Sequence, residues 1–387
     1  MDLVEQGNGP AVRLLIASNG DPRNERAFSG SLRALCDALA RRGVVHHTAN
    51  VSGRNDAFVR RSLPVRAFQK LDPFHLIERY RWSRMAFRMN SMRAQRAART
   101  QPGFNACLMY GTAFNSQLDV PTYCYLDATS AQIYKARQWE FRWFSARKAQ
   151  SVIDYQREVF HMCTGIFPRT GWVGDSVIND FGVPPEKIHV ATAGPNYTLE
   201  PAPHGPYDAQ RILFIGRDFE RKGGPLILEA FRLTRAALPS AKLVIVGCEV
   251  AVDEPGVEVM GVIKKDAPGG LDRLLDLYRH ASVFCMMSHY EPFGIVVIEA
   301  QDCYVPCVVP RRFAFPEMVL DGVTGRCVEE YDARVLADTL IELLSDPVRL
   351  EAMGRAGHDH VRANYTWDKA AERIYQQIQR DLAARRT

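Results

Sequence analysis

Two glutamates flank a short turn in the second half of the chain. Glu291 opens the sequence Glu-Pro-Phe-Gly, just after the apolar run 282–287, and Glu299 follows eight residues later. The apolar run predicts a buried parallel strand, and 295–301 predicts the start of a helix, so Glu299 lies about two turns into that helix. At this edge of an open α/β sheet helix amino termini bind phosphate, and carboxylates suit hydroxyls. The pattern indicates a phosphate that carries sugars on both sides.

Two cations occupy a loop nearer the middle of the chain. The predicted strand 211–215 continues into Gly-Arg-Asp-Phe-Glu-Arg-Lys-Gly-Gly, residues 216–224. Arg217 offers a planar fork of donors and Lys222 a point charge, which together suit a departing diphosphate. Gly223 allows the backbone to approach a ligand closely. A basic surface turn is the other reading of this loop.

Both segments resemble elements of the retaining glycosyltransferases of family 4, which have the GT-B fold. The stretch from Glu291 to Glu299 is similar to the Glu-x7-Glu element of that family, and 216–223 is similar to its diphosphate element, Gly-Arg-x(4)-Lys-Gly. The resemblance extends over nearly the whole chain and implies two Rossmann-like parallel-sheet domains that face each other across a cleft. It implies an acceptor domain at 1–200, a linker at 201–210 and a nucleotide-sugar domain at 211–366. A final helix at 367–387 is expected to cross back to the first domain.

The resemblance also implies a role for each residue of the site. Arg217, Lys222 and the amide groups after Gly294 would stabilise the negative charge that grows on the diphosphate. Glu299 would bind the ribose hydroxyls, and Glu291 would bind the donor sugar. The other substrate contacts that the resemblance implies are Gly30, Gly216, Gly223, Val262, Ile263, Pro292, Phe293 and Ile295.

The first domain supplies fewer motifs. The loop 19–31 follows the apolar run 12–18 but contains no Gly-x-Gly-x-x-Gly, which argues against a dinucleotide-binding dehydrogenase. In the family the matching loop faces the cleft, so Gly30 is expected to border the acceptor site. A helix-capping loop, with Ser29 or Ser31 near the cap, is the alternative.

One acidic residue of the first domain is a further candidate for the site. Asp127 directly follows the predicted strand 122–126, in a Tyr-x-Asp-x-Thr sequence. This sequence is similar to a family element whose acidic or histidine residue approaches the donor sugar. Asp127 is therefore expected to contact the sugar, and helix capping is its alternative role.

Two helical stretches of the first domain mix aromatic, basic and apolar residues. Residues 78–99 carry seven arginines among tryptophan, phenylalanine and methionine. From Arg79 to Arg99 this helix could contact an anionic membrane surface or hold an anionic acceptor, or it could be a solvated face. No motif indicates nucleic acid as a partner. Trp139 and Trp143 share a helical face and are expected in the core, with stacking on a sugar as the alternative.

Composition sets the broad class of the protein. At 387 residues and 43.6 kDa the chain is expected to form two domains. A hydrophobic content of 47% and a charged content of 24% are typical of soluble globular proteins. The sequence has no apolar run of about 18 residues, its amino terminus is polar, and its nine cysteines form no Cys-x-x-Cys pair. A cytoplasmic location, with peripheral contact at the inner face of the membrane, is expected.

The expected activity follows from the resemblance. A retaining hexosyltransferase would move a sugar from a nucleotide-diphosphate sugar to a hydroxyl of a carbohydrate, lipid-linked or small-molecule acceptor. No cofactor is expected, and no metal is expected because Asp-x-Asp is absent from the chain. A nucleotide-sugar epimerase or phosphorylase of the same fold, and a non-catalytic nucleotide-sugar-binding protein, are the alternatives.

The sequence departs from the family pattern after Glu299. Tyr304 stands where the family has a glycine before its Pro-Val-Val strand, and Ala314-Phe315 replaces a glycine pair before Pro-Glu. Arg311 and Arg312 precede that pair. Larger residues there could narrow the sugar pocket or add a charge to it.

Overall fold

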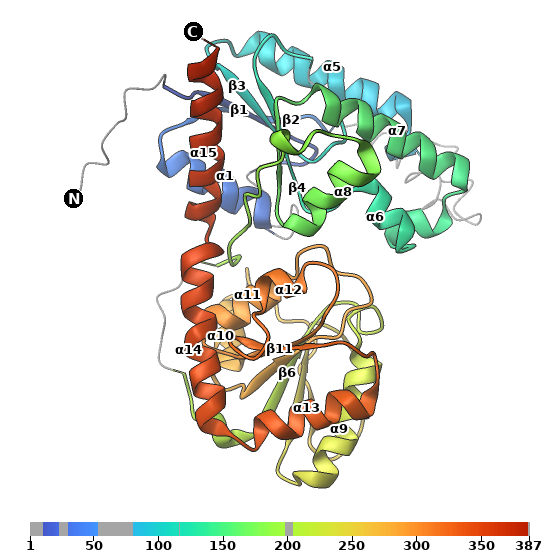
Figure 1. Cartoon of the computed structure of the whole chain (residues 1–387), viewed down its shortest axis with the longest axis vertical. Helices are drawn as coiled ribbons and strands as arrows, with labels where there is room; N and C mark the ends of the chain where they lie inside the picture. The colour runs from blue at the N-terminus through green and yellow to red at the C-terminus, as the bar shows by residue number, and fades with distance from the viewer. Residues whose placement is uncertain (1–10, 23–29, 53–79, 116, 198–203, 386–387) are drawn as a thin grey trace, which may run out of the picture. The chain divides into compact units, whose positions relative to one another are not determined.

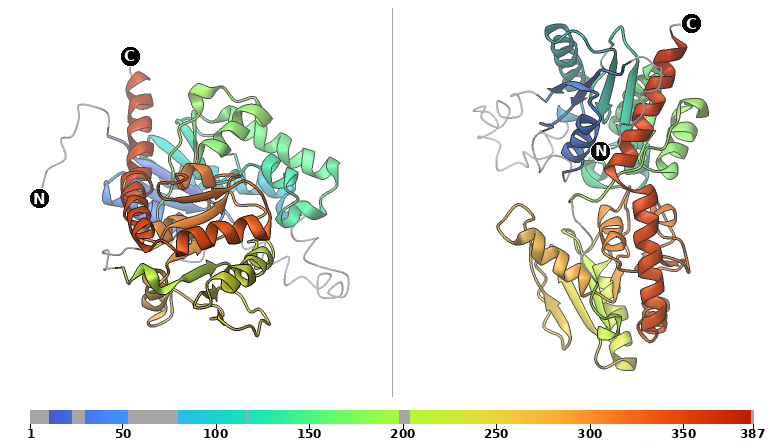
Figure 2. Two further views of the ribbon diagram at one scale, coloured as in Figure 1. Left: turned by 60° about the horizontal axis from the view of Figure 1, so that its bottom comes forward. Right: turned by 90° about the vertical axis from the view of Figure 1, so that its left-hand side faces the viewer.

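Two compact units make up the chain. The computed structural model describes residues 11–22, 30–52, 80–115, 117–197 and 204–385. One unit is Met1–Ala193 with Trp367–Thr387, and the other is Gly194–Thr366. In each unit a parallel sheet lies between two layers of helices (Figures 1 and 2).

The sheet of the first unit has five strands in the described residues, in the order β2-β1-β3-β4-β5, with all neighbours parallel. Every residue of β1, β3 and β5 is buried, as in parallel strands that helices cover on both faces. This burial explains the continuous apolar runs that mark these strands in the sequence. The bounds are β1 (Leu14–Ser18), β2 (Val45–Asn50), β3 (Ala106–Tyr110), β4 (Thr122–Leu126) and β5 (Gly165–Pro168).

Helices cover both faces of this sheet. α1 packs against α15 on one face, and α5 and α7 lie on the other, where the rings of Phe87 and Tyr155 stack at 4.1 Å (Figure 1). The bounds are α1 (Ser31–Arg41), α5 (Arg84–Thr100), α6 (Ser130–Lys135), the 3-10 helix η2 (Trp139–Trp143), α7 (Ala146–Met162), α8 (Gly171–Phe181), the 3-10 helix η3 (Pro185–Lys187) and α15 (Trp367–Ala384).

The last helix of the chain belongs to the first unit. Asp368 of α15 pairs with Arg41 of α1 at 2.8 Å. Further along α15, Asp381 accepts a hydrogen bond of 2.8 Å from the hydroxyl of Tyr123 in β4. These polar contacts hold α15 at both ends of its buried apolar stripe.

The basic helix begins later than the sequence predicted. Instead of covering 78–99, α5 starts at Arg84, and the residues before 80 lie outside the described part of the chain. The Ser83 side chain accepts a hydrogen bond of 3.1 Å from the amide of Ala86 and so caps the helix. A cap residue has an extended backbone, which ends the helix on that side.

The second unit has a six-stranded parallel sheet in the described residues, in the order β11-β10-β9-β6-β7-β8. β6 and β9 are neighbours at the centre, and the strand order runs in opposite directions from them. The bounds are β6 (Arg211–Ile215), β7 (Lys242–Val246), β8 (Val257–Val259), β9 (Val283–Cys285), β10 (Cys307–Pro310) and β11 (Gly325–Val328).

Two helix layers enclose the second sheet. α9 and α13 pack together over one face, around a core that includes Ile212, Phe231 and Leu340, and α11 packs against α14 on the other (Figure 1). The bounds are the 3-10 helix η4 (Tyr207–Ala209), α9 (Gly224–Ala237), α10 (Gly270–Arg279), α11 (Ile295–Asp302), α12 (Phe315–Met318), α13 (Ala333–Leu344) and α14 (Pro347–Asn364).

All nine cysteines are buried and none forms a disulfide. Burial raises the pKa of the Cys36 and Cys163 thiols to about 12, so they pack as small hydrophobic side chains. Among the helices of the described residues, none has the length and apolar character needed to span a bilayer.

Candidate functional site

The two motifs of the second unit meet at the centre of its sheet. The cation loop follows β6 and the Glu-Pro-Phe-Gly turn follows β9, and these strands are hydrogen-bonded neighbours. The connections that leave them run toward opposite edges of the sheet, which makes this the topological switch point. Ligands of open α/β sheets bind outside the carboxyl ends of the strands at such a point.

Backbone hydrogen bonds join the two loops. The amide of Met287 donates to the carbonyl of Lys222 at 3.2 Å, and the amide of His289 donates to the carbonyl of Arg221 at 2.9 Å. Gly223 has a φ of 79°, and a Cβ there would lie 2.0 Å from the carbonyl oxygen of Met287. The close neighbour that requires glycine at 223 is therefore the backbone of the chain itself.

An ion pair joins the side chains of the two motifs. Lys222 donates from Nζ to Oε2 of Glu291, and the side chains are only 13% and 10% exposed. The other oxygen of Glu291, Oε1, accepts a hydrogen bond of 3.1 Å from the amide of Gly294. Gly216 makes room for the lysine stem, because a Cβ at 216 would lie 2.9 Å from Cγ of Lys222. Glu291 therefore fixes the position of the ammonium group.

Arg217 lies differently from Lys222. Its side chain is exposed, and in the described part of the chain no hydrogen bond or ion pair of its guanidinium is found. The neighbouring acid, Asp218, instead binds Arg221 at 3.3 Å. A cation that is exposed and unpaired can turn toward an anionic ligand without first breaking an ion pair.

The amino terminus of α11 has open amide groups. Gly294 caps the helix with a φ of 68° and no side-chain hydrogen bond. The amide of Val297 donates to the carbonyl of Gly294 at 2.9 Å, whereas among the described residues the amides of Ile295 and Val296 have no acceptor. Such amides bind anions. Phe293 is 3% exposed and packs near Tyr365, so it shapes the turn from within.

Glu299 is a second buried carboxylate with its own lysine. It is 1% exposed, and its Oε1 accepts from Nζ of Lys265 at 2.6 Å and from the amide of Asn196 at 3.2 Å. Its Oε2 accepts from the hydroxyl of Tyr278 at 3.2 Å. Burial raises the pKa of Tyr278 well above its usual value, so this phenol stays a donor. Sequence reasoning missed Lys265, although it lies two residues after the predicted contact Ile263.

The predicted substrate contacts Val262 and Ile263 lie in a turn after β8. The strand ends at Val259, and Gly261 has a left-handed backbone with a φ of 64°. Val262 is 51% exposed, and Ile263 is half-buried. The contact of this turn with a substrate stays a prediction.

The candidates of the first unit lie at the carboxyl edge of its sheet. Gly30 caps α1 with a φ of 90° and no side-chain hydrogen bond, so Ser31 is not the cap, and Ser29 lies outside the described residues. Tyr110 ends β3, and its hydroxyl accepts a hydrogen bond from Arg169. Gly30 thus lies at the same sheet edge as a buried arginine.

Asp127 pairs with that arginine. The capping role is wrong, because Thr129 caps α6 and Gln132 completes the capping box. Oδ2 of the half-exposed Asp127 lies 3.7 Å from Nη1 of Arg169, which is 5% exposed beneath the ring of Tyr125. Sequence reasoning missed Arg169. The available signal was its place immediately after the strand 165–168, at the carboxyl edge of a parallel sheet.

The two tryptophans expected in the core are exposed. Trp139 is 42% exposed and Trp143 is 53% exposed, with the guanidinium of Arg142 over the Trp143 ring at 4.5 Å. The segment is a 3-10 helix, in which side chains four residues apart do not share a face. Phe141 between them takes the core position.

Of the departures from the family pattern, Ala314 and Phe315 are buried, and Ala314 has a right-handed backbone. Tyr304 and Phe313, the residue before that pair, have a left-handed backbone. Tyr304 has a φ of 63° and Phe313 a φ of 58°, where glycine is the unstrained residue. Tyr304 stacks on His358 with ring centroids 4.0 Å apart. Phe313 packs edge-on against Tyr290, next to Glu291. The aromatic contacts explain how both positions tolerate a side chain.

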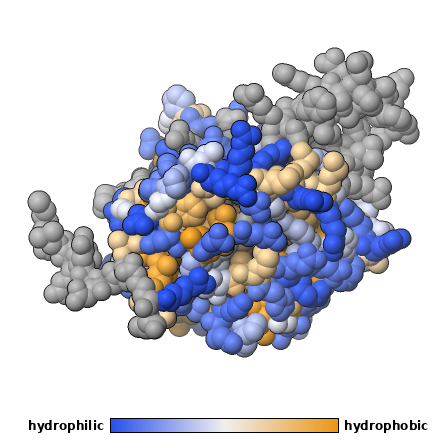
Figure 3. Space-filling model, turned by 90° about the horizontal axis from the view of Figure 1, so that it is seen from above, coloured by the Kyte–Doolittle hydropathy of each residue, from blue (hydrophilic) through white to orange (hydrophobic). Residues whose placement is uncertain are grey.

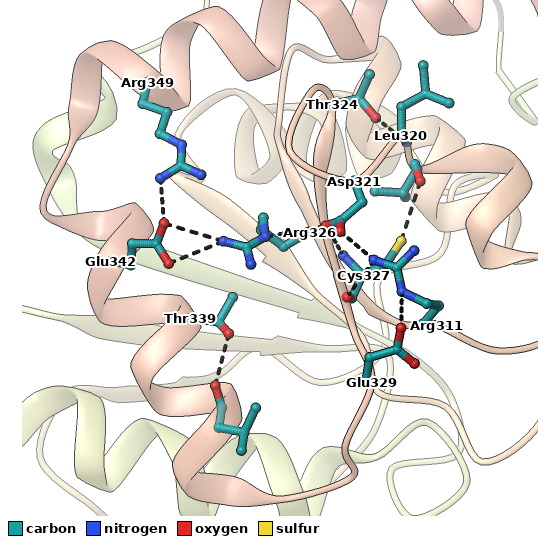
Figure 4. Close-up of polar contacts among 12 residues, drawn as sticks. Arg311, Leu320, Asp321, Thr324, Arg326, Cys327, Glu329, Thr339, Glu342 and Arg349 are labelled. Carbon is teal, nitrogen blue, oxygen red and sulfur yellow. Dashed lines mark hydrogen bonds and ion pairs between the residues drawn. The ribbon is translucent and has the colours of Figure 1, made fainter.

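Arg311 does not add a free charge to the pocket. It pairs with Asp321 and, at 2.5 Å, with Glu329 (Figure 4). Asp321 also accepts from the amide of Cys327 at 2.9 Å, and Arg326 links Asp321 to Glu342. Arg311 thus belongs to a surface network that ties β10, β11 and α13 together.

Two Rossmann-like units, each built on a parallel sheet with its candidate residues at the carboxyl edge, define the GT-B fold. Sucrose-phosphate synthase from Thermosynechococcus elongatus has this fold, with a TM-score of 0.64 and 17% identity over 96% of this chain and 100% of that chain. The expected fold class is confirmed.

The sequence comparisons give the family. The family described as "Glycosyl transferases group 1" matches residues 199–360, most of the second unit. A D-inositol 3-phosphate glycosyltransferase of Thermobispora bispora is 29% identical over 51% of this chain and 51% of its own length. A GDP-mannose-dependent monoacylated alpha-(1-6)-phosphatidylinositol monomannoside mannosyltransferase of Corynebacterium glutamicum is 34% identical over 40% and 43%. The chain spans about half the length of these curated relatives. The match to the glycosyl transferases group 1 family therefore extends over residues 199–360 of the second unit.

Proposed function

We propose that this protein is a retaining glycosyltransferase that moves a hexosyl group from a nucleotide-diphosphate sugar to an acceptor hydroxyl. The observation that carries the proposal is the switch point between β6 and β9. There Lys222 is fixed beside Glu291, and within the described residues Arg217 has no ion pair and the first amides of α11 have no acceptor. This set of donors suits a diphosphate, and the match of residues 199–360 to a glycosyltransferase family supports that ligand.

In the proposed reaction the bond between the anomeric carbon and the β-phosphate oxygen breaks as the acceptor hydroxyl oxygen forms a new bond to that carbon, and the hydroxyl proton passes to the departing phosphate oxygen. Negative charge then grows on the nucleoside diphosphate. Lys222, Arg217 and the amides of Ile295 and Val296 stabilise this charge without a metal ion. Fixed donors of this kind each contribute about 10²–10³ in kcat. The product is the glycosylated acceptor, in which the anomeric configuration of the donor sugar is retained.

The two glutamates divide the donor between them in this proposal. Glu299 binds the ribose hydroxyls, and Glu291 contacts the transferred sugar while it holds Lys222 in place. The support for Glu291 in this double role is its geometry, with one oxygen on the lysine and the other on the amide of Gly294. Carboxylates accept hydrogen bonds from hydroxyls at these positions, so neither glutamate needs to act as a nucleophile.

The acceptor is proposed to carry a negative charge. The two relatives are named for D-inositol 3-phosphate and for a phosphatidylinositol monomannoside, which are both phosphate-bearing polyols. The buried Arg169, with Asp127 and Tyr110 at the carboxyl edge of the first sheet, is the group in the first unit that suits such an acceptor.

Peripheral contact with a membrane is proposed through α5. The outer stripe of this helix alternates methionine and arginine: Met85 is 66% exposed and Met92 is 54% exposed, and Arg88, Arg96 and Arg99 are also exposed. The helix contains no acidic residue. The end of the first unit, over which α5 runs in Figure 1, mixes hydrophobic and hydrophilic side chains in Figure 3. Basic and apolar residues in this mixture bind anionic lipid surfaces.

The test of the proposed activity has two stages. A thermal-shift screen with UDP-, GDP-, ADP- and dTDP-sugars identifies the donor, and mass spectrometry then follows product formation with phosphorylated polyols as acceptors. We expect a donor that raises Tm and a glycosylated product that Lys222→Gln fails to make.

The alternatives give different outcomes in the same experiment. An epimerase releases an isomerised donor or free sugar without any acceptor. A non-catalytic binding protein shows the rise in Tm but no turnover, and Lys222→Gln then changes binding alone. Either result would contradict the proposed transferase activity.

A further inference from the structure

Glu299 already accepts three hydrogen bonds from groups of the protein itself. It is almost completely buried, and both of its oxygens already accept hydrogen bonds. Oε1 receives the ammonium of Lys265 at 2.6 Å and the amide of Asn196 at 3.2 Å, and Oε2 receives the Tyr278 hydroxyl at 3.2 Å. A carboxylate has about four acceptor positions, so roughly one remains. Two neighbouring ribose hydroxyls that both donate to Glu299 need two acceptor positions.

Of the three donors to Glu299, only Lys265 can leave easily. The donor from Asn196 is a backbone amide, and Tyr278 is fully buried. The Lys265 side chain is 37% exposed and comes from the turn after β8. Its ammonium also lies 5.6 Å from the centre of the Tyr197 ring, a contact that favours the paired position. Lys265 is therefore the donor to Glu299 that hydroxyls of a ligand can replace most easily.

We propose that Lys265 occupies the ribose position of Glu299 when the donor is absent, and that donor ribose must displace it. This inference rests on the proposed function, because it assumes that Glu299 binds ribose. Lys265 is then a residue that sets donor affinity: a ligand without both ribose hydroxyls cannot replace the lysine and binds weakly.

Displacement of Lys265 by ribose predicts opposite changes in Tm and in ribonucleotide affinity when the lysine is replaced. In Lys265→Gln the empty protein keeps a buried carboxylate without its ion pair, which lowers stability. The bound protein is less affected, because ribose hydroxyls satisfy Glu299 in either case. Binding of a ribonucleotide should therefore become tighter in the variant while Tm of the empty protein falls. If Lys265 only supports the fold, its replacement should lower both Tm and the affinity for the ribonucleotide.

The experiment compares Lys265→Gln with Lys264→Gln by isothermal titration calorimetry. Lys264 is the matched control, since it is exposed in the same turn and no ion pair of its side chain is found in the described residues. The probes are the nucleoside diphosphate that wild type binds best and its 2′,3′-dideoxy analogue. We expect about tenfold tighter binding of the ribose form to Lys265→Gln, a shift of one decade in Kd, and no gain for the dideoxy form.

Each other outcome overturns the proposal. Weaker binding of the ribose form by Lys265→Gln would make the lysine a direct donor contact, and an equal gain in Lys264→Gln would make it a general charge effect. Lys265→Arg keeps a cation and should bind as wild type does, which guards against a folding defect in the glutamine variant. If wild type binds no nucleoside diphosphate, the proposed function itself fails, whereas wild-type binding without a gain in Lys265→Gln removes only this inference.

Discussion

Arg221 donates a hydrogen bond of 2.9 Å from Nη1 to the carbonyl oxygen of Tyr290, the residue before Glu291. It thereby joins the loop after β6 to the loop after β9 by a side chain, in addition to the two backbone hydrogen bonds between them. Arg217, in the same loop, makes no such contact in the described part of the chain. Two arginines of one short loop thus have separable roles, one in the fold and one available for a ligand.

The first prediction separates these two arginines. Arg217→Gln should lower kcat by about 10²-fold and leave Tm unchanged, because it removes a ligand donor but no contact of the protein. Arg221→Gln should lower the free energy of unfolding by about 1–2 kcal/mol, since it removes a charged hydrogen bond to a carbonyl. Steady-state kinetics and urea unfolding of both variants check the assignment. Loss of stability in Arg217→Gln with normal turnover would reverse it.

The second prediction concerns the buried pair of Lys222 and Glu291. Lys222→Met or Glu291→Gln alone leaves one group without its partner, and we expect each to cost up to about 3–5 kcal/mol in unfolding free energy. The double variant Lys222→Met/Glu291→Gln should regain part of that stability, because neither charge is left behind. Its turnover should stay as low as in Lys222→Met.

A double-mutant cycle, measured by chemical unfolding and by kcat, therefore separates stability from catalysis at this pair. Recovered stability without recovered turnover supports Lys222 as a ligand donor. Near-normal turnover in the double variant would remove both residues from the site.

The third prediction is an acid-sensitive contribution from the network in Figure 4. The hydrogen bond from Arg349 lowers the pKa of Glu342 more than burial raises it, and Arg326 adds to the lowering. A lowered pKa in the folded state gives stability that is present above about pH 4.3, the usual value, and is lost as pH falls through the lowered value.

The Glu342 side chain is 48% exposed and that of Arg349 is 35% exposed. Their ion pair should therefore contribute about 1 kcal/mol or less to the free energy of unfolding. Urea unfolding of wild type and Glu342→Gln should differ at about pH 6, and the difference should shrink at a pH below about 4.3. The difference should also shrink at about 1 M salt, where exposed ion pairs are screened. An equal difference at both pH values would show that the carboxylate acts through packing instead.

The fourth prediction tests the contact of α5 with anionic lipid. Arg88→Gln/Arg96→Gln should reduce co-sedimentation with phosphatidylserine-containing vesicles, at about 1 kcal/mol for each lost charge. Arg273→Gln/Arg334→Gln, two exposed arginines of the second unit, removes the same charge elsewhere and should have no effect. Equal losses in the two pairs would mean that net charge, and not this helix, decides binding.

The central strands could be predicted from sequence because helices cover both faces of each sheet. The strand bounds 122–126 and 211–215 agree with the prediction, and after Thr122 and Arg211 both runs are apolar for that reason. The prediction that Trp139 and Trp143 lie in the core was wrong because an α-helix, with 3.6 residues per turn, was expected. The segment is a 3-10 helix with three residues per turn. A sequence of only five residues does not distinguish an α-helix from a 3-10 helix.

The candidate site could be predicted only as far as its motifs. The spacing of Glu291 and Glu299 carries the resemblance, but nothing in the sequence pairs Glu299 with Lys265, which lies in a turn 34 residues earlier. The same holds for Asp127 and Arg169, which meet because their strands are neighbours in the sheet. Partners in a parallel sheet come from separate βα units, so their pairing depends on strand order.

The most direct measurement is a crystal structure of the protein with a nucleoside diphosphate bound. Our account predicts the diphosphate at the carboxyl ends of β6 and β9, within hydrogen-bond distance of Lys222 and of the amides of Ile295 and Val296, with ribose on Glu299. A nucleotide bound elsewhere on the second unit, with Lys222 still paired only to Glu291, would contradict it.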